Sequence, residues 1–363
     1  MGAGFDARMV RHLVSTYGKA AHGGVRLYEL DNEPDLWNST HRDVHPDPLS
    51  ESELWSKSHA TARAVKSADP TSDVIGPSDW GWCAYFYSAK DDCGSSNADR
   101  DAHGGLPFGE WYLKQFAKAQ RSGGTRLLDY FDEHFYPQES GVALSPAGDA
   151  ATQALRLRST RALWDPTYVD ESWISDANGG KPLAWIRTMR AWVKREYPGT
   201  RTAISEYNWG GLDSMNGALA QADVLGIFGR ERLGLATLWS PAKARDPWAY
   251  AFRMYRNYDG HGGQFGNTSV HAHSTDQGRL AVYAASRRSD GALTVMVVNK
   301  SGSAIQAPIR LRHVTAAHRA HVFRYSADHL HQIVKGASVR VAHGHLATTY
   351  PASSITLLVL PRR

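Results

Sequence analysis

The sequence predicts an α/β protein whose parallel sheet is favoured as a (β/α)8 barrel, followed by an all-β sandwich. Up to about residue 263, short apolar segments alternate with helical patterns, and polar and aromatic residues gather just after the short segments. From about Gln264 the pattern changes to period-2 runs separated by turn residues. We therefore expect a barrel domain over residues 1–263 and a sandwich domain over residues 264–363.

The expected elements begin with a helix over 7–17, where apolar residues recur at helical spacing, and a strand over 25–30. Ser50 and Glu53 form a capping-box pattern for a helix that ends near Ser67. Further strands are expected at 73–77, 127–132, 202–206 and 235–239. Further helices are expected near 108–119, 150–162, 182–196, 217–231 and 248–258. Sandwich strands are expected at 280–284, 293–299, 321–325 and 354–360. Asn32-Glu33-Pro34 follows the first strand in place of a Gly-rich loop, which disfavours a nucleotide-binding fold.

The composition excludes several classes of function. The net charge is +5, but Lys and Arg are scattered without a run of five, so we expect a solvated surface and no nucleic-acid partner. Since 18 consecutive apolar residues occur nowhere, we expect no membrane span, and the N-terminus lacks a signal-peptide pattern. Cys83 and Cys93 either form a local disulfide or remain thiols, and the sequence leaves both open.

Two glutamates follow short apolar strands in similar surroundings. Glu33 stands in Asp31-Asn32-Glu33-Pro34, and Glu206 stands in Ile204-Ser205-Glu206-Tyr207-Asn208. A lone Glu is ordinarily a solvated surface charge, but two carboxylates at strand ends of one sheet form a candidate pair. Cleavage of a glycosidic bond uses such a pair, with one group protonating the leaving oxygen and the other attacking the sugar or activating water.

The segment 28–46, which contains Glu33, resembles the acid/base segment of glycoside hydrolase family 44. Segments 76–82, 204–209, 218–226 and 252–260 resemble the same family in the same order, so the resemblance covers essentially the whole chain. It implies a retaining endo-β-1,4-glucanase, often active on xyloglucan, with a (β/α)8 barrel and a β-sandwich. Glu33 would be the acid/base at the end of the fourth strand, and Glu206 the nucleophile at the end of the seventh. Only strands four to eight are then present, so we expect a partial, N-terminally truncated barrel.

Several residues are candidates for sugar binding. Asn32 resembles the Asn that binds the sugar 2-hydroxyl in related barrels, and the less favoured alternative is an Asn that stabilises a turn. His134 and Tyr136 end another strand and are expected to orient Glu206, unless His134 is simply structural. Trp239 ends the last barrel strand and is the candidate platform under the sugar at the cleavage point, with Trp82 ranked beside it. The other aromatic candidates are Trp37, Trp80, Tyr207 and Trp209.

No cofactor is required by this chemistry. Asp92, Asn97, Asp99 and Asp101 lie in an acidic segment with oxygen ligands at short spacing, which is either a structural calcium loop or a solvated turn. The His residues show no paired spacing for a catalytic zinc.

The primary interpretation is an endo-acting retaining β-glucanase that is secreted, as the resemblance implies. Its expected partner is a β-glucan or xyloglucan polysaccharide, and we expect a monomer with no nucleic-acid or membrane partner. One alternative is an inactive sugar-binding remnant, since an incomplete barrel need not hold the two Glu residues in register. The other is a related barrel glycosidase, such as a mannanase or xylanase, which shares the chemistry and differs in its subsites.

Overall fold

The computed structural model describes residues 2–240, 243–314 and 317–362. The chain divides into two compact units, each of which takes segments from several parts of the sequence. The barrel unit contains Met1–Tyr136, Trp185–Tyr207 and Leu233–Trp239. The β unit contains Pro137–Ala184, Asn208–Arg232 and Ser240–Arg363. The expected division between residues 263 and 264 stays a prediction.

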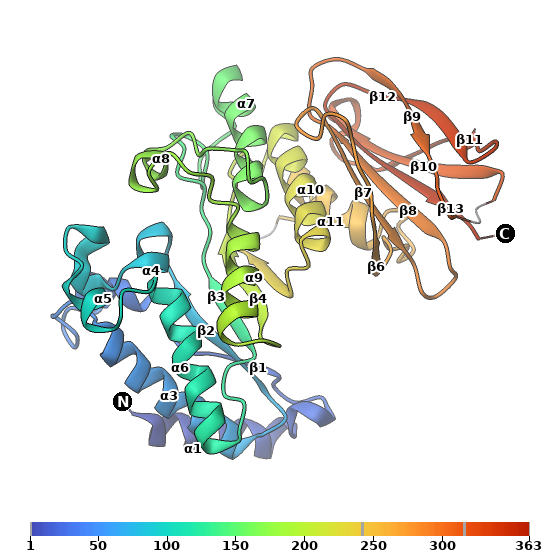
Figure 1. Cartoon of the computed structure of the whole chain (residues 1–363). Coiled ribbons are helices and arrows are strands. Elements are labelled where there is room, and N and C mark those ends of the chain that lie inside the picture. The colour runs from blue at the N-terminus through green and yellow to red at the C-terminus, as the bar shows by residue number, and fades with distance from the viewer. Residues whose placement is uncertain (1, 241–242, 315–316, 363) are drawn as a thin grey trace. The chain divides into compact units, whose positions relative to one another are not determined.

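The barrel unit is built on one parallel sheet whose strands pair in chain order (Figure 1). Its strands are β1 (Leu27–Glu29), β2 (Asp73–Asp79), β3 (Tyr130–Glu133), β4 (Arg201–Tyr207) and β5 (Leu235–Leu238). Its helices are α1 (Ala3–Tyr17), α2 (Trp37–Thr40), α3 (Glu51–Ala68), α4 (Trp82–Phe86), α5 (Ala98–Ala102), α6 (Phe108–Gly123) and α9 (Trp185–Glu196). The predicted partial barrel is therefore confirmed, with five parallel strands among the described residues.

Local sequence explains how several of these elements begin and end. Ser50 caps α3, since its side-chain oxygen accepts a hydrogen bond from the Glu53 N–H at 3.2 Å, as the capping-box pattern predicts. The chain leaves α3 at Asp69, just before Pro70, which lacks a backbone donor. In the segment that follows β2, the structure joins Cys83 and Cys93 in a disulfide, which the sequence left open.

Among the described residues, the β unit contains two antiparallel sheets and four α-helices (Figure 1). The six-stranded sheet has the order β11-β10-β13-β8-β7-β6, and the second sheet pairs β12 with β9. The strands are β6 (Thr268–Val270), β7 (Leu280–Ser286), β8 (Leu293–Asn299), β9 (Ile305–Arg310), β10 (Arg319–Ser326), β11 (Val334–Arg340), β12 (His345–Tyr350) and β13 (Ser354–Leu360). The helices are α7 (Ala150–Ser159), α8 (Trp173–Ala177), α10 (Met215–Arg230) and α11 (Pro247–Arg256). This confirms the predicted C-terminal antiparallel domain.

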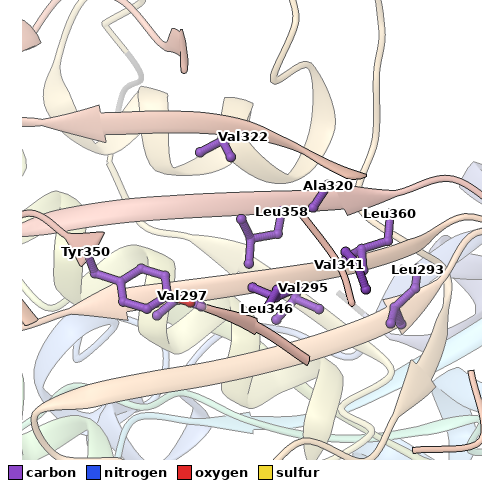
Figure 2. Packing of buried hydrophobic residues seen from close by; sticks show 10 residues of the cluster. All are labelled: Leu293, Val295, Val297, Ala320, Val322, Val341, Leu346, Tyr350, Leu358 and Leu360. Carbon is purple, nitrogen blue, oxygen red and sulfur yellow. The ribbon is translucent and has the colours of Figure 1, made fainter. Parts of the chain in front are cut away.

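The central strands β8 and β13 are buried along their whole length, because each face has its own cover. On one face, alternate residues such as Val295 and Leu358 pack with Leu346 and Tyr350 of β12, as Figure 2 shows. The other face contacts α10, where Gly226 allows a close approach of β7: a Cβ atom at this position would lie 2.2 Å from the Tyr283 ring. Burial of each such aliphatic side chain contributes about 1.5–3 kcal/mol to folding.

Among the helices of the described residues, none combines the length and apolarity needed to cross a membrane.

Candidate active site

The candidate site lies at the carboxyl ends of the parallel strands in the barrel unit. Glu33 follows β1 after a short turn, His134 follows β3 directly, and Glu206 is the next-to-last residue of β4. Backbone hydrogen bonds hold these ends in register: the Glu33 N–H donates to the Ser78 carbonyl at 3.0 Å, and the Phe135 N–H donates to the Glu206 carbonyl at 2.9 Å. Parallel strands bring their carboxyl ends to one edge of the sheet, which explains why these distant residues meet.

The turn that carries Glu33 has an unusual backbone. Glu33 has a φ of 45°, in the left-handed region, and Asp31 has a φ of 92°. Pro34 then starts a 3-10 helix over Pro34–Leu36, with its fixed φ suited to the first helical position. A non-glycine residue held at positive φ costs on the order of 1 kcal/mol and is over-represented at functional sites. The Asn-Glu-Pro segment is therefore held in one conformation at the strand end.

The side chains of four residues form one continuous group of hydrogen bonds and ion-pair contacts. His134 Nδ1 lies 2.9 Å from Glu33 Oε1 and 3.4 Å from Glu206 Oε2. The Tyr136 hydroxyl donates to Glu206 Oε2 at 2.8 Å. The nearest polar atoms of the three side chains, a carboxylate oxygen of Glu33, a ring nitrogen of His134 and a carboxylate oxygen of Glu206, all lie within 4.8 Å of one another. The structure thus brings together the two predicted carboxylates and both residues expected to orient them.

The surroundings tune the protonation of this group. Burial raises the pKa of Glu206, and the nearby charges of Glu33 and Glu29 raise it further, while His134 and Tyr136 act in the opposite direction. Burial lowers the pKa of His134, but its hydrogen bond to Glu33 and the charge of Glu206 outweigh burial, and the net pKa is raised. Burial and the bond to Glu206 raise the pKa of the Tyr136 phenol, which therefore stays a neutral donor.

Asp132 forms a second layer beneath this group that the sequence reasoning missed. It is fully buried and accepts hydrogen bonds from Ser78 Oγ at 2.7 Å and from the Ser205 N–H at 2.8 Å. Burial raises its pKa, and its carboxylate favours the charged form of His134. A signal was present in the sequence: Asp132, His134 and Tyr136 alternate along one extended segment, so their side chains share a face.

A second group, Glu29, Asp132 and His134, also brings three ligand atoms within 4.8 Å of one another. Ser205 Oγ donates toward both Glu29 and Asp132, so these carboxylates already have hydrogen-bond partners from β4. The two groups meet at His134, and both belong to the candidate active site.

The predicted sugar-binding residues occupy different surroundings. Asn32 is exposed beside Glu33, and Trp80 is half-buried after β2. Trp239 follows β5 and is 56% exposed, so its ring can cover a sugar. The remaining candidates are buried: Trp37, Trp82, Tyr207 and Trp209.

The buried aromatic candidates have packing roles that explain their burial. Trp82 packs against Phe86 and Tyr87, and Trp37 packs against His45. Trp209 belongs to the β unit, where its indole N–H donates to Ser159 Oγ at 3.0 Å. Rings buried in this way offer no open face for a sugar, so the expectation of sugar stacking at these positions is not supported by their surroundings. A sugar-binding role for Trp82 stays a prediction.

The acidic segment considered for calcium does not assemble the expected ligands. Asp92, Asn97 and Asp101 are exposed, and Asp99 is buried with its carboxylate accepting from the Glu51 N–H and from Ser88 Oγ. Within the described part of the chain, the three Asp residues form no group of ligand atoms within 4.8 Å of one another. These four residues therefore do not fit a calcium site as a set.

Comparisons with known proteins concern the family and the fold of this chain. The sequence profile described as glycoside hydrolase family 44 matches residues 1–139. The crystal structure of a bifunctional glucanase-xylanase from a metagenome library is 42% identical, has a TM-score of 0.95, and covers 100% of this chain and 70% of its own. The family 44 xyloglucanase of Paenibacillus polymyxa, solved with xyloglucan, is 31% identical, with a TM-score of 0.89 and coverage of 98% and 70%.

A curated relative, Endoglucanase A of Paenibacillus lautus, is 36% identical over 298 residues, which are 80% of this chain. The chain spans 42% of the length of that relative. The match with solved family members nevertheless includes both units and more than two thirds of those chains. This chain belongs to glycoside hydrolase family 44.

Proposed function

We propose that this chain is a retaining endo-β-1,4-glucanase of the xyloglucanase type, which cleaves cell-wall β-glucans by double displacement. The observation that carries the proposal is the close approach of Glu33 and Glu206, whose nearest ligand atoms lie within 4.8 Å with His134 between them. Retaining enzymes hold their carboxyl groups about 5–5.5 Å apart, whereas inverting enzymes leave about 6.5–9.5 Å for a water molecule. The short separation favours direct attack by one carboxylate.

In the first step, Glu206 attacks the anomeric carbon while Glu33 protonates the departing glycosidic oxygen. The described contacts of the Glu206 carboxylate with Tyr136 and His134 both fall on Oε2, so Oε1 is the oxygen assigned to the attack. The Tyr136 bond fixes the carboxylate orientation and favours its ionised form, which a nucleophile requires. The products are a shortened glucan and a glycosyl ester of Glu206.

In the second step, Glu33 acts as a base and takes a proton from water, which then hydrolyses the glycosyl ester. Ester formation removes the negative charge of Glu206. Because that charge helps to raise the pKa of His134, its loss disfavours the binding of a second proton by His134. His134 thus responds to the charge state of both carboxylates, because its Nδ1 contacts each of them. It acts as a positioning residue, and it reacts with neither the sugar nor water.

The names of relatives guide the choice of substrate. Xyloglucan is bound in the Paenibacillus polymyxa relative, and the metagenome relative is described as a glucanase-xylanase. We therefore assign β-glucan and xyloglucan as the first substrates and xylan as the second. Trp239 supplies an exposed ring next to the strand ends, and Asn32 supplies an exposed amide beside the acid.

Glu33→Gln and Glu206→Gln test the two roles in the 363-residue chain. Each should lower xyloglucan hydrolysis by at least about a thousandfold, since each removes a group that reacts directly. With an activated aryl glycoside, azide should rescue both variants and give an α-glycosyl azide from Glu206→Gln but a β-glycosyl azide from Glu33→Gln. Glu53→Gln changes a partly exposed carboxylate on α3 and should keep full activity. Activity retained in either site variant would refute the assignment.

A further inference from the structure

The positive charge of this protein is concentrated in its C-terminal part. Residues 264–363 contain 12 Lys and Arg but only three Asp and no Glu, which is a net charge of +9 with His neutral. The preceding residues contain 29 Lys and Arg against 33 Asp and Glu, a net charge of −4, and the two parts together give the +5 of the chain. Nine of the 17 His residues also lie in this C-terminal part. Such a field attracts anionic partners.

The β unit contains a groove, which we define as three adjoining hollows of about 740, 240 and 460 Å³ that all include Tyr258 and Asp259. The largest hollow lies between α11, the loop after it and strands β10 and β11. Its apolar floor consists of Tyr250, Tyr258 and Phe323, which are 7%, 6% and 8% exposed.

Two cations line this groove without an acidic partner. Among the described residues, neither Arg253 nor Lys335 forms an ion pair, although the Arg253 guanidinium lies 4.6 Å from the centre of the Tyr250 ring. A third cation, Arg287, is fixed by Asp290 and by the Tyr258 hydroxyl. The stacking of Arg253 on a ring leaves the edge of its guanidinium for a carboxylate.

The remaining polar groups are suited to sugar hydroxyls. Asn257, Asp259 and His261 are exposed at the groove. Asp259 Oδ1 accepts from the N–H groups of His261 and Gly263, which fixes the loop and holds this one carboxylate in place. The groove therefore combines a rigid polar wall, an apolar floor and two unpaired cations.

We propose that this groove binds an acidic polysaccharide, a chain of uronic-acid residues whose carboxylates pair with Arg253 and Lys335. Uronic-acid residues present both the carboxylates and the hydroxyls that the groove can satisfy. Single-stranded nucleic acid fits less well, because its bases need exposed ring faces to stack on and none of these three rings is more than 8% exposed. This site does not depend on glucan hydrolysis, so the two proposals stand or fall separately.

The test is affinity of the 363-residue chain for polygalacturonate, measured by calorimetry, beside fully methyl-esterified pectin as the uncharged counterpart. Arg253→Gln with Lys335→Gln should weaken binding to polygalacturonate about tenfold, because two partly exposed charge pairs are lost. The matched control, Arg310→Gln with Arg312→Gln, removes two exposed charges outside the groove and should weaken binding less than about twofold.

Equal weakening in both double variants would overturn the proposal, because binding would then follow net charge alone. Equal affinity for the esterified polymer, or tighter binding of an oligodeoxynucleotide of the same charge, would also overturn it. Hydrogen exchange of the unmodified chain with an oligogalacturonate gives a readout that does not depend on the folding of any variant. Protection at residues 250–263 and 333–336 supports the groove, and protection found only at β-unit residues that line none of the three hollows contradicts it.

Discussion

Removal of the Tyr136 hydroxyl should change the pH dependence of hydrolysis in a predictable direction. In Tyr136→Phe, Glu206 Oε2 loses the donor that lies 2.8 Å away. A hydrogen bond to an ionised group is worth about 1.5–3 kcal/mol, and one pKa unit corresponds to about 1.36 kcal/mol. The Glu206 side chain is 14% exposed, so water replaces part of the lost bond. We therefore expect the pKa of Glu206 to rise further, with a free-energy change at the lower end of that range.

The sign follows from the role of Glu206 as an ionised nucleophile. A higher pKa in the variant lowers the ionised fraction at acid pH and leaves it unchanged well above the pKa, so the acid limb of the profile moves to higher pH. The assay is kcat/KM against pH with an aryl β-cellobioside. Tyr197→Phe is the matched control, since it removes a hydroxyl bonded to Gln120 Oε1 at 2.6 Å without changing the acid limb. A uniform loss of activity at every pH, or a shift of the limb to lower pH, would refute the reasoning.

Three further predictions concern stability. The Lys300 ammonium lies 2.9 Å from Asp223 and is 3% exposed, and Asp223→Asn leaves it without its counterion. This variant should lower the free energy of unfolding by about 3–5 kcal/mol in urea titrations. A loss below about 1 kcal/mol would contradict the prediction. Burial raises the pKa of Glu51 to about 8, so its ionisation on unfolding destabilises the protein progressively from about pH 4.5 to pH 8. Over that window, Glu51→Gln should gain stability relative to the parent protein, by at most about 5 kcal/mol. A stability difference that does not change with pH would be evidence against this prediction. Reduction of the Cys83–Cys93 disulfide, which closes a loop of sequence separation 10, should cost about 2–3 kcal/mol, and an identical melting temperature with and without reductant would exclude that contribution.

Much of the fold could be predicted because local pattern and tertiary structure agree. The period-2 runs over 293–299 and 354–360 correspond residue for residue to β8 and β13. These strands lie in the middle of the sheet and are buried along their whole length, so each is marked by a short and nearly continuous apolar run. Strands β6, β9, β11 and β12 were not predicted. Strands β9, β11 and β12 alternate half-buried or buried positions with exposed ones and so lack a continuous apolar run, and β6 is three residues long.

The two carboxylates of the candidate site could be predicted from the sequence, whereas most of the residues around them could not. Glu33 and Glu206 could be found because strand ends in a parallel sheet meet, which follows from topology alone. The hydrogen bond between Asp132 and Ser205 depends on the register of β3 against β4, and this register cannot be predicted from a single sequence. Burial of Trp82 and Trp209 depends on long-range packing with partners such as Phe86 and Ser159, so local composition could not separate packing from sugar binding.

The central claim, that Glu206 attacks the sugar, is tested most directly by covalent trapping. A 2-deoxy-2-fluoro cellooligosaccharide with a good leaving group slows hydrolysis of the glycosyl ester and allows it to accumulate. Peptide mass spectrometry of the trapped 363-residue chain should find one sugar adduct, on the peptide that contains Glu206, and none in Glu206→Gln. An adduct on another residue, or no adduct on the folded chain, would contradict the account.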